Sequence, residues 1–414
     1  MLASELELCR LCGDSNLPVI FDLGLQALAG RFPAANEPDV PKAPLRLMKC
    51  RACGLVQLGH NIDPDELYRS NYGYRSGINM TMRNHLAGIS GRAAALTNLG
   101  AGDTVLDIGS NDGTLLKSYE VAGISRVGID PTIAQYQDYY PEDVLTVADF
   151  FSAERFCAVS PTAKARVVTS IAMFYDLPDP NSFVADIAVI LAEDGIWVFE
   201  QSDLGSMLKA QSFDTVCHEH LEYWALRQIK KVVEAQGLRI FDVELNGCNG
   251  GSARVFACHQ DGSYPTNETA VSAAEKREQE LGLDQLETFE VFRRNAEDVR
   301  TRLRALLEAE TAKGRSIHIY GASTKGNVLL QYCGIDHSLV DAAADRNPRK
   351  WGCRTPGTNI PIISEEESRA AKPNYFLVLP WHFRAEFVER EADFIAAGGK
   401  LIFPLPEIEI YPSP

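Results

Sequence analysis

The sequence predicts an α/β protein in three parts, and two features of the chain predict it. Apolar, strand-like runs alternate with helix-compatible stretches from about residue 79 to 260, and the alternation resumes after Gly314. Such alternation is typical of parallel, doubly wound sheets. The first 78 residues differ, because they hold paired cysteines and only short strand-like pieces among prolines and glycines. We therefore expect a small N-terminal module, a central Rossmann-like domain and a smaller C-terminal Rossmann-like domain.

Length and composition agree with this organisation. The chain has 414 residues, of which 45% are hydrophobic and 23% charged, as in ordinary globular proteins. A polar stretch with apolar residues at three- or four-residue steps predicts a helix between the two α/β domains. The expected divisions are a module over 1–78, a central domain over 79–267, a connecting helix over 268–313 and a C-terminal domain over 314–414.

Individual strands follow from short apolar runs bounded by turn residues. In the first module these runs are Pro18 to Leu23 and Gly54 to Leu58. The central domain has four such runs: Thr104 to Ile108, Arg126 to Ile129, Val167 to Ile171 and Gly195 to Glu200. The C-terminal domain has four more, at 316–321, 338–345, 374–380 and 400–406.

The charge balance argues against two classes of partner. Lys and Arg number 40 against 56 Asp and Glu, a net charge of -16, so the chain would repel a phosphate backbone. The chain shows no apolar run of about 18 residues and no basic, apolar start typical of a signal peptide. We therefore expect a cytoplasmic protein without a nucleic-acid or membrane partner.

Paired cysteines mark the N-terminal module. Cys9 with Cys12, and Cys50 with Cys53, form two CxxC turns, each followed by a glycine. Two such turns bring four thiolates to one centre, which is the ligand set of a closed structural zinc site. The 37 residues between the pairs exceed the spacing of short zinc ribbons, so a redox pair, another metal or chance spacing stays an alternative.

A glycine turn follows the first central strand. The dinucleotide fingerprint places glycine at the first, third and sixth positions of such a turn. Counted from Gly109, this chain has Asn111 at the third position and Thr114 at the sixth, which disfavours a pyrophosphate cradle. We expect Asp107, Gly109, Asn111 and Gly113 instead to hold a ligand that is cationic and carries a ribose.

Two further acidic residues suit the same ligand. Asp130 follows the next strand, 23 positions after Asp107, where a carboxylate can accept both ribose hydroxyls. Asp149, beside Phe150, is placed to meet an adenine amino group while an aromatic face covers the base. These features resemble the S-adenosylmethionine-dependent methyltransferase superfamily, which implies S-adenosylmethionine as the cofactor. The alternative is a plain strand–helix–strand unit with a glycine cap.

Five motifs narrow this resemblance. They are the CxxC pairs, SNYGYRSG at 70–77, FDTVCHEHLEYW at 213–224, NGG at 249–251 and YGASTKGN at 320–327. In this order they resemble the three-part sugar C-methyltransferases that act on nucleotide-linked 4-keto deoxysugars. The resemblance implies that a zinc module, a cofactor-binding domain and a C-terminal Rossmann-like domain enclose a thymidine-diphosphate or similar sugar.

The resemblance also implies a catalytic histidine. A ketone at sugar carbon 4 makes the proton on carbon 3 removable as an enolate, which a sulfonium methyl can then alkylate. Removal needs a base that works near neutral pH, and the family's histidine aligns with His220. Glu219 would orient that ring or bind a sugar hydroxyl. Tyr72 would contact the substrate, and Tyr74 would relay a proton or stabilise the oxyanion.

The C-terminal domain is expected to bind the nucleotide part of the substrate. A glycine turn follows its first strand and opens a helix with Ser323, Thr324 and Lys325, which offer hydroxyls and a cation to a diphosphate. By resemblance, the remaining substrate-binding residues are Asn249, Gly250, Trp381 and His382.

Three positions depart from better-known members of the family. Cys217 and His218 replace the tyrosine and aspartate that precede the Glu-His pair, and Asp176 lies in a loop where those members place a histidine. The sequence therefore does not predict which sugar is bound.

Other readings of these motifs stay open. His218 and His220 could hold a metal or be structural. Three rival functions remain. The protein could methylate oxygen or nitrogen, it could epimerise the carbon beside the ketone, or it could be a non-catalytic assembly module.

Overall fold

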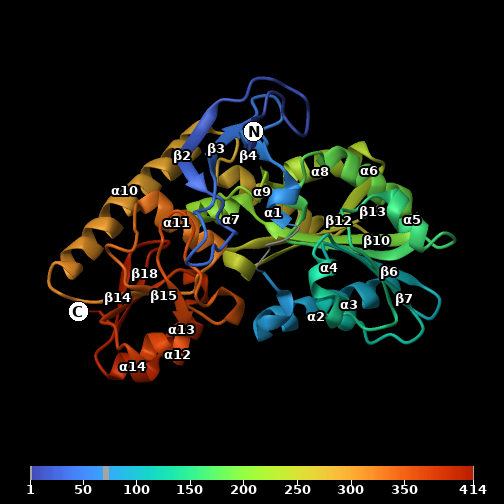
Figure 1. Cartoon of the computed structure of the whole chain (residues 1–414). Helices are drawn as coiled ribbons and strands as arrows, with labels where there is room; N and C mark the ends of the chain where they lie inside the picture. The colour runs from blue at the N-terminus through green and yellow to red at the C-terminus, as the bar shows by residue number, and fades with distance from the viewer. Residues whose placement is uncertain (1, 69–73, 414) are drawn as a thin grey trace.

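A four-stranded antiparallel sheet forms most of the N-terminal region in the computed structural model, which describes residues 2–68 and 74–413 (Figure 1). The sheet order is β2 (Val19–Ala27), β3 (Lys42–Lys49), β4 (Val56–Leu58) and β11 (Glu222–Tyr223). Along β3 buried residues alternate with more exposed ones, as expected for a strand with one face on a core. Strand β11 comes from the central part of the chain, so the segment just after His220 is held by pairing with this module.

Two short strands and a helix complete the module. Strands β1 (Ala3–Glu5) and β5 (His60–Ile62) pair antiparallel, and helix α1 (Pro64–Tyr68) follows. The predicted strand pieces at Pro18 and Gly54 correspond to β2 and β4, with β2 longer and β4 shorter than expected.

The central sheet has seven strands in the order β12-β13-β10-β9-β6-β7-β8. They are β6 (Thr104–Ile108), β7 (Ser125–Ile129), β8 (Val144–Val147), β9 (Ala165–Ile171), β10 (Leu191–Ser202), β12 (Leu238–Asn246) and β13 (Ser252–His259). Strands β8, β7, β6, β9 and β10 are parallel, whereas β13 is antiparallel to both neighbours. The predicted doubly wound α/β fold is confirmed. Strand β8 was not among the predicted strands, although three of its four residues are apolar; only Val144 is buried.

Helices cover both faces of this sheet (Figure 1). They are α2 (Met80–Thr97), α3 (Thr114–Lys117), α4 (Ile133–Tyr136), α5 (Ala153–Val159), α6 (Pro180–Ile190) and α8 (Leu226–Ala235). Helix α7 (Leu204–Lys209) packs instead in the cluster that contains Phe21 of β2. Ile89 of α2 and Ile133 of α4 lie in one buried cluster, whereas Phe156 of α5 and Ile187 of α6 lie in another.

The C-terminal sheet has six strands, parallel except for the last. In sheet order they are β16 (Ile362–Ser364), β15 (Ala342–Asp345), β14 (Ile317–Tyr320), β17 (Tyr375–Val378), β18 (Lys400–Phe403) and β19 (Glu409–Tyr411). Its helices are α11 (Thr324–Cys333), α12 (Glu365–Ala370), α13 (Arg384–Arg390) and α14 (Ala392–Ala396). All four predicted strands are present, as β14, β15, β17 and β18.

The segment expected to be one connecting helix forms two. Helix α9 (Glu268–Glu280) packs against β12, and helix α10 (Leu286–Thr311) packs against β2 and α11. Gly282 lies between them with φ +64°, a left-handed conformation that ends a helix and that glycine adopts without steric cost. Figure 1 shows α10 running along the outside of the molecule past β2 and α11.

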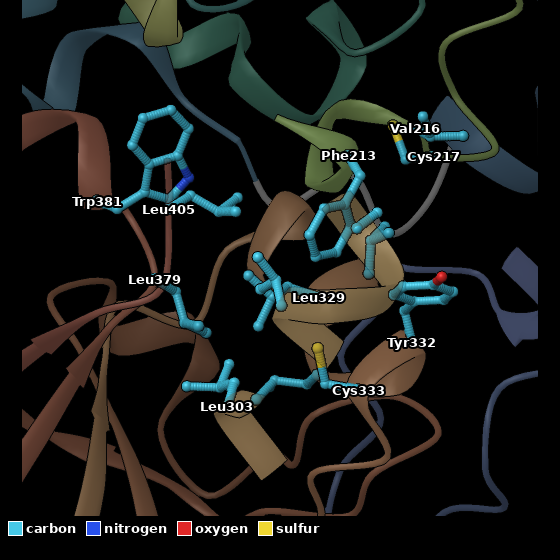
Figure 2. Packing of buried hydrophobic residues seen from close by; sticks show 14 of the residues in the cluster. Phe213, Val216, Cys217, Leu303, Leu329, Tyr332, Cys333, Leu379, Trp381 and Leu405 are labelled. Carbon is cyan, nitrogen blue, oxygen red and sulfur yellow. The ribbon is translucent and has the colours of Figure 1, made fainter. Parts of the chain in front are cut away.

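One buried cluster joins three regions that are far apart in sequence. It contains Phe21 of β2, Phe213 of the loop before β11 and Leu329 of α11. Figure 2 shows Phe213 lying beside Leu329 and Tyr332, and the Phe213 and Tyr332 ring centroids are 5.3 Å apart. The loop that carries His220 is therefore anchored to the C-terminal domain as well as to the N-terminal sheet. None of the helices described is long and apolar enough to cross a membrane.

Candidate active site

The four predicted cysteine ligands, Cys9, Cys12, Cys50 and Cys53, converge in a four-cysteine cluster. The sulfur atoms of Cys9 and Cys53 are 3.6 Å apart, and those of Cys12 and Cys50 are 3.5 Å apart. All four sulfur atoms lie within 4.8 Å of one another. Tetrahedral zinc with Zn–S bonds of about 2.3 Å requires sulfurs about 3.8 Å apart, so the four-cysteine cluster fits a closed zinc site.

The predicted glycine turn joins β6 to α3. Gly109, Asn111 and Gly113 all have positive φ, at 71°, 51° and 70°, so the chain reverses within a few residues. A Cβ atom at Gly113 would lie 2.9 Å from the ring of Tyr140, which leaves no room for a side chain. The turn therefore depends on glycine for both conformation and space.

Two buried carboxyl groups stand at the carboxyl ends of neighbouring strands. Asp107 lies in β6, and Asp130 directly follows β7. Burial raises the pKa of Asp107 to about 7, and the charge of Asp130 adds to this effect, while a 2.6 Å hydrogen bond donated by the Thr169 hydroxyl opposes it. A cationic ligand would favour the ionised form, so these residues fit the cofactor expected there.

Asp130 is already well supplied with donors. Its Oδ2 accepts the Asn111 backbone N–H at 2.9 Å, and its Oδ1 accepts both the backbone N–H and the hydroxyl of Thr132 at 2.6 Å. A carboxylate has roughly four acceptor positions. Binding of both ribose hydroxyls therefore requires one donor to leave, and the rotatable Thr132 hydroxyl is the one that can.

A segment from the predicted SNYGYRSG motif lies across the glycine turn. The Ser76 N–H donates to Asn111 Oδ1 at 2.9 Å, and the Gly77 N–H donates to Asp112 Oδ2 at 3.1 Å. The Asn111 amide in turn donates to the Tyr74 carbonyl at 3.2 Å. Tyr74 is thus tied to the cofactor turn through its backbone, and the residue is about half exposed. Tyr72 lies outside the described residues.

Asp149 and Phe150 follow β8, the strand at the edge of the sheet. Both are partly exposed, and Asp149 Oδ2 pairs with Arg155 of α5 at 2.8 Å. Its other oxygen accepts the Phe150 N–H at 2.9 Å. An adenine amino group would therefore share this carboxylate with an arginine.

His220 is held in a defined orientation. Its Nδ1 lies 2.9 Å from the Thr215 carbonyl, which can only accept, so Nδ1 carries the hydrogen and Nε2 has the free lone pair. The Tyr175 ring centroid is 4.2 Å from that of His220. The Thr215 carbonyl thus orients the His220 ring, and an orienting role of Glu219 stays a prediction.

The surroundings of His220 keep its ring neutral. Burial lowers the pKa of His220 to about 3, the charge of Lys325 lowers it further, and the Thr215 carbonyl acts in the opposite direction. This pKa lies well below the near-neutral value expected from the sequence. The reason is that the ring is shielded from water and stands close to a cation.

Glu219 lies where the N-terminal module meets α11. A Cβ atom built on Gly30 would be 2.3 Å from Glu219 Oε1 and 3.7 Å from the Thr324 hydroxyl oxygen. Burial raises the pKa of Glu219, which favours the protonated carboxyl group. A protonated Glu219 can donate as well as accept a hydrogen bond.

His218 has a different environment from His220. Its ring is fully buried, its Nε2 lies 3.3 Å from the Ala43 carbonyl of β3, and burial lowers its pKa to about 4. Among the described residues, neither His218 nor His220 belongs to a group with metal-binding geometry. The metal alternative for this histidine pair therefore has no support.

The predicted nucleotide-binding residues come together from two regions. Lys325 of α11 donates to the Asn249 carbonyl at 2.9 Å. A Cβ atom on Gly250 would contact Trp381 at 3.7 Å and His382 at 3.9 Å. The NGG turn of the central sheet thus meets the C-terminal domain at this point.

The start of α11 is capped by its own side chain. Ser323 Oγ accepts the Gly326 N–H at 3.1 Å, as an N-cap residue does. Thr324 follows as the first residue of the helix, and its hydroxyl approaches Gly30 as described above.

Several residues near His220 could not be identified from the sequence as part of the site. Thr215 acts through its backbone carbonyl, which any residue type supplies. Asp214 is buried and accepts the Trp381 indole N–H at 2.9 Å, so it links the His220 loop to the C-terminal domain. Glu222 and Asp203 line a small pocket with His220. Only the tertiary structure brings these groups to the candidate base.

Three family models match successive parts of the chain. One described as a putative zinc binding domain matches residues 9–68, and one described as a methyltransferase domain matches residues 82–243. One described as a C-methyltransferase C-terminal domain matches residues 247–406.

Solved structures of other methyltransferases align with part of the chain. Magnesium protoporphyrin IX methyltransferase from Synechocystis is 13% identical with a TM-score of 0.34, covering 44% of this chain and 88% of that one. An S-adenosylmethionine-dependent methyltransferase from Clostridium acetobutylicum is 10% identical with a TM-score of 0.35, covering 43% and 92%. At such low scores these alignments carry no argument.

A curated relative aligns over nearly the whole chain. The C-methyltransferase NovU of Streptomyces niveus is 32% identical over 403 residues, which cover 96% of this chain and 95% of that protein. The three family models give a zinc-binding part, a methyltransferase part and a C-methyltransferase part in this order, and the relative is itself named a C-methyltransferase. The chain therefore belongs to the S-adenosylmethionine-dependent C-methyltransferases with an N-terminal zinc-binding domain.

Proposed function

We propose that this enzyme methylates carbon 3 of a nucleotide-linked 4-keto-6-deoxysugar, with His220 as the base that forms the enolate. The observation that carries the proposal is the bond from His220 Nδ1 to the Thr215 carbonyl, which leaves Nε2 as a neutral, oriented acceptor. A base needs this protonation state and a fixed direction before the substrate arrives. The four-cysteine cluster is then the site of a structural zinc, because four sulfurs complete its coordination.

The low pKa of His220 suggests how substrate binding activates the base. Lys325 is one cause of that low pKa, and it is also the cation expected to meet the diphosphate. A bound diphosphate would neutralise Lys325 and so remove its effect on the imidazole. The pKa of His220 would then rise from about 3, while burial, the larger cause of its low value, would remain.

The cofactor half of the site is built from carboxylates. When bound, S-adenosylmethionine supplies an electrophilic methyl group. Asp107 would face its positive charge, Asp130 would take the ribose hydroxyls, and Asp149 with Phe150 would receive the adenine. The turn at Gly109 and Gly113 would let the backbone approach the ligand closely.

We infer that Tyr74 and Glu219 manage charge and hydroxyl groups of the sugar. Deprotonation at carbon 3 puts negative charge on the carbonyl oxygen, which a hydroxyl donor would stabilise. Tyr74 is tied to the cofactor turn by the hydrogen bond from the Asn111 amide to its carbonyl, and its hydroxyl would be this donor. Glu219, with its raised pKa, would bind a sugar hydroxyl from the side of α11. Tyr72 completes the same motif as Tyr74.

The test separates deprotonation from methyl transfer. The enzyme is incubated in deuterium oxide with thymidine-, guanosine- and cytidine-diphosphate 4-keto-6-deoxysugars, with and without S-adenosylmethionine, and products are analysed by mass spectrometry and proton–carbon NMR. We expect deuterium at carbon 3 without the cofactor and a new carbon–carbon bond with it.

The decisive variant is His220→Asn. It should lose both deuterium exchange and methylation while S-adenosylhomocysteine still binds, whereas His337→Asn, at an exposed histidine of the C-terminal domain, should behave as wild type. Methylation of oxygen or nitrogen by the wild-type enzyme would refute the substrate chemistry, and normal exchange by His220→Asn would remove this residue from its role.

A further inference from the structure

A second group of metal-type side chains lies in the central domain, away from the four-cysteine cluster. His85 comes from α2, Glu200 from β10 and Cys248 from the turn between β12 and β13. One nitrogen, one oxygen and one sulfur atom of the three residues lie within 4.8 Å of one another. Within the described ranges, only this trio and the four-cysteine cluster show such geometry. Neither the function proposed above nor the family comparison uses these three residues.

The carboxylate of this group is held so that one oxygen faces the histidine. Glu200 is 3% exposed, and its Oε2 accepts the Arg254 Nε–H and the Asn246 amide, both at 2.9 Å. Its Oε1 lies 2.5 Å from His85 Nε2. Outer hydrogen bonds of this kind orient metal-binding carboxylates in proteins.

One side chain positions two of the three candidate ligands. The amide nitrogen of Asn246 donates to Glu200, while its Oδ1 accepts the backbone N–H of Cys248 at 2.9 Å. The next residues, Asn249 and Gly250, have φ of +52° and +93°, so the chain turns sharply after the cysteine. The Cys248 thiol is therefore carried by a short turn whose backbone is held by Asn246.

We propose that His85, Glu200 and Cys248 form a second metal site, for a divalent cation such as Zn2+. Imidazole, carboxylate and thiolate are the three ligand types that protein zinc sites use. A thiolate and a carboxylate balance the charge of the ion. Arg254 adds positive charge: its Nη2 lies 2.9 Å from Glu200 Oε2 and 3.4 Å from His85 Nε2, and its Nη1 pairs with Glu244 at 3.0 Å. Three protein ligands leave one coordination position open, in contrast to the closed four-cysteine cluster.

Metal binding requires one local change. Two ligand atoms on a tetrahedral zinc ion, bound at about 2.0–2.2 Å, lie roughly 3.3 Å apart. The 2.5 Å contact between His85 and Glu200 must therefore open as the cation replaces the proton that these atoms share. The His85 side chain is 19% exposed and Glu200 is buried, so the histidine is the group that moves.

The test is metal stoichiometry in the full-length protein. Wild-type protein is equilibrated with zinc chloride at neutral pH, desalted and analysed by inductively coupled plasma mass spectrometry. We expect two zinc ions per chain, and one in His85→Asn and in Cys248→Ser. Cys157→Ser, which removes an exposed cysteine of α5, should retain two. Circular dichroism checks that each variant is folded.

A second measurement distinguishes the two sites by rate. With the chromogenic chelator 4-(2-pyridylazo)resorcinol, the site with an open position should release zinc first, as a fast phase of one ion per chain that His85→Asn lacks. One zinc ion in the wild type, or an unchanged zinc content in both folded variants, would overturn the proposal.

Discussion

Two strand–turn–helix units in this protein share a backbone plan and differ in charge. In the central sheet, the turn after β6 donates the Asn111 N–H to Asp130, which follows the neighbouring strand β7, at 2.9 Å. In the C-terminal sheet, the turn after β14 donates the Ala322 N–H to Asp345, the last residue of the neighbouring strand β15, at 3.0 Å. Both turns are opened by a glycine with positive φ.

The neighbours of the two carboxylates make the difference. Asp345 is paired with Lys350 at 3.3 Å, and Lys325 follows the same turn. No described Lys, Arg or His forms an ion pair with Asp130, and Asp107 stands beside it. We therefore expect the same local architecture to give an anionic site that suits a cationic nucleoside and a cationic site that suits a diphosphate, with charge and not the turn selecting the ligand.

The largest expected effect comes from removing the anionic charge. Asp130→Asn should weaken S-adenosylhomocysteine binding by about 100-fold, because hydrogen bonds to a charged group contribute about 1.5–3 kcal/mol each. Isothermal titration calorimetry measures this loss. Asp345→Asn, the equivalent change in the other unit, should leave S-adenosylhomocysteine affinity unchanged, and equal losses in both variants would break the comparison.

Gly113 of the central turn should not tolerate a side chain. Gly113→Ala should lower the free energy of unfolding by about 2–3 kcal/mol, because it adds left-handed strain and a contact with Tyr140. Gly237 has a similar φ of +72° with no neighbouring atom within 4 Å, so Gly237→Ala reports the strain alone, about 1 kcal/mol. Urea denaturation measures the free energy of unfolding of both variants. An equal loss in the two would show that the Tyr140 ring moves aside without an energetic penalty.

Removing the Lys325 cation of the C-terminal unit should weaken binding of the nucleotide and not of the cofactor. Lys325→Met should weaken thymidine diphosphate binding by about tenfold, since one charge-assisted contact is lost, and leave S-adenosylhomocysteine affinity unchanged. It should also raise the pKa of His220, because the Lys325 charge now lowers it. The Lys372→Met variant, at an exposed lysine of the same domain, is the control.

The pH profile of deuterium exchange by ligand-saturated enzyme tests the link between Lys325 and His220. In Lys325→Met, the fall in exchange rate on the acidic side of this profile should occur at the same pH as in the wild type or at a higher pH. A shift to lower pH would contradict the sign of the effect.

The smallest expected effect is a pH dependence confined to the anionic unit. The pKa of Asp107 is raised to about 7, so below pH 7 this group becomes protonated and loses its attraction for a cation. The association constant of S-adenosylmethionine should therefore fall by up to about tenfold per pH unit below 7. Calorimetry at pH 6 and pH 8 tests this, and Asp107→Asn should flatten the profile.

Local patterns predicted the elements whose signal lies within a few residues. The apolar runs of β6, β7 and β9 and the two CxxC turns were visible because every residue that forms them is close in sequence. Strand β8 was not predicted, although its sequence, VLTV, is mostly apolar. The break between α9 and α10 at Gly282 escaped it because the apolar spacing continues across the glycine.

The candidate site was predictable in its residue types and not in its contacts. The sequence indicated His220 and Lys325, but the orienting Thr215 carbonyl and the proximity of Lys325 to the imidazole depend on how the loop packs. His85 and Glu200 are 115 residues apart in the chain, and no spacing rule connects them.

By itself the sequence determined three things: the alternating α/β plan, the four sulfur ligands and the opposite charges that follow two similar glycine turns. Each of these depends on short segments, a strand, a CxxC turn or a glycine turn, whose residues are close together along the chain. Only the tertiary structure decided that β11 joins the N-terminal sheet, that Phe213 anchors the base loop on α11, and that His220 stays neutral beside Lys325. The reason is physical, because burial and charge proximity depend on distances in space that local sequence does not specify.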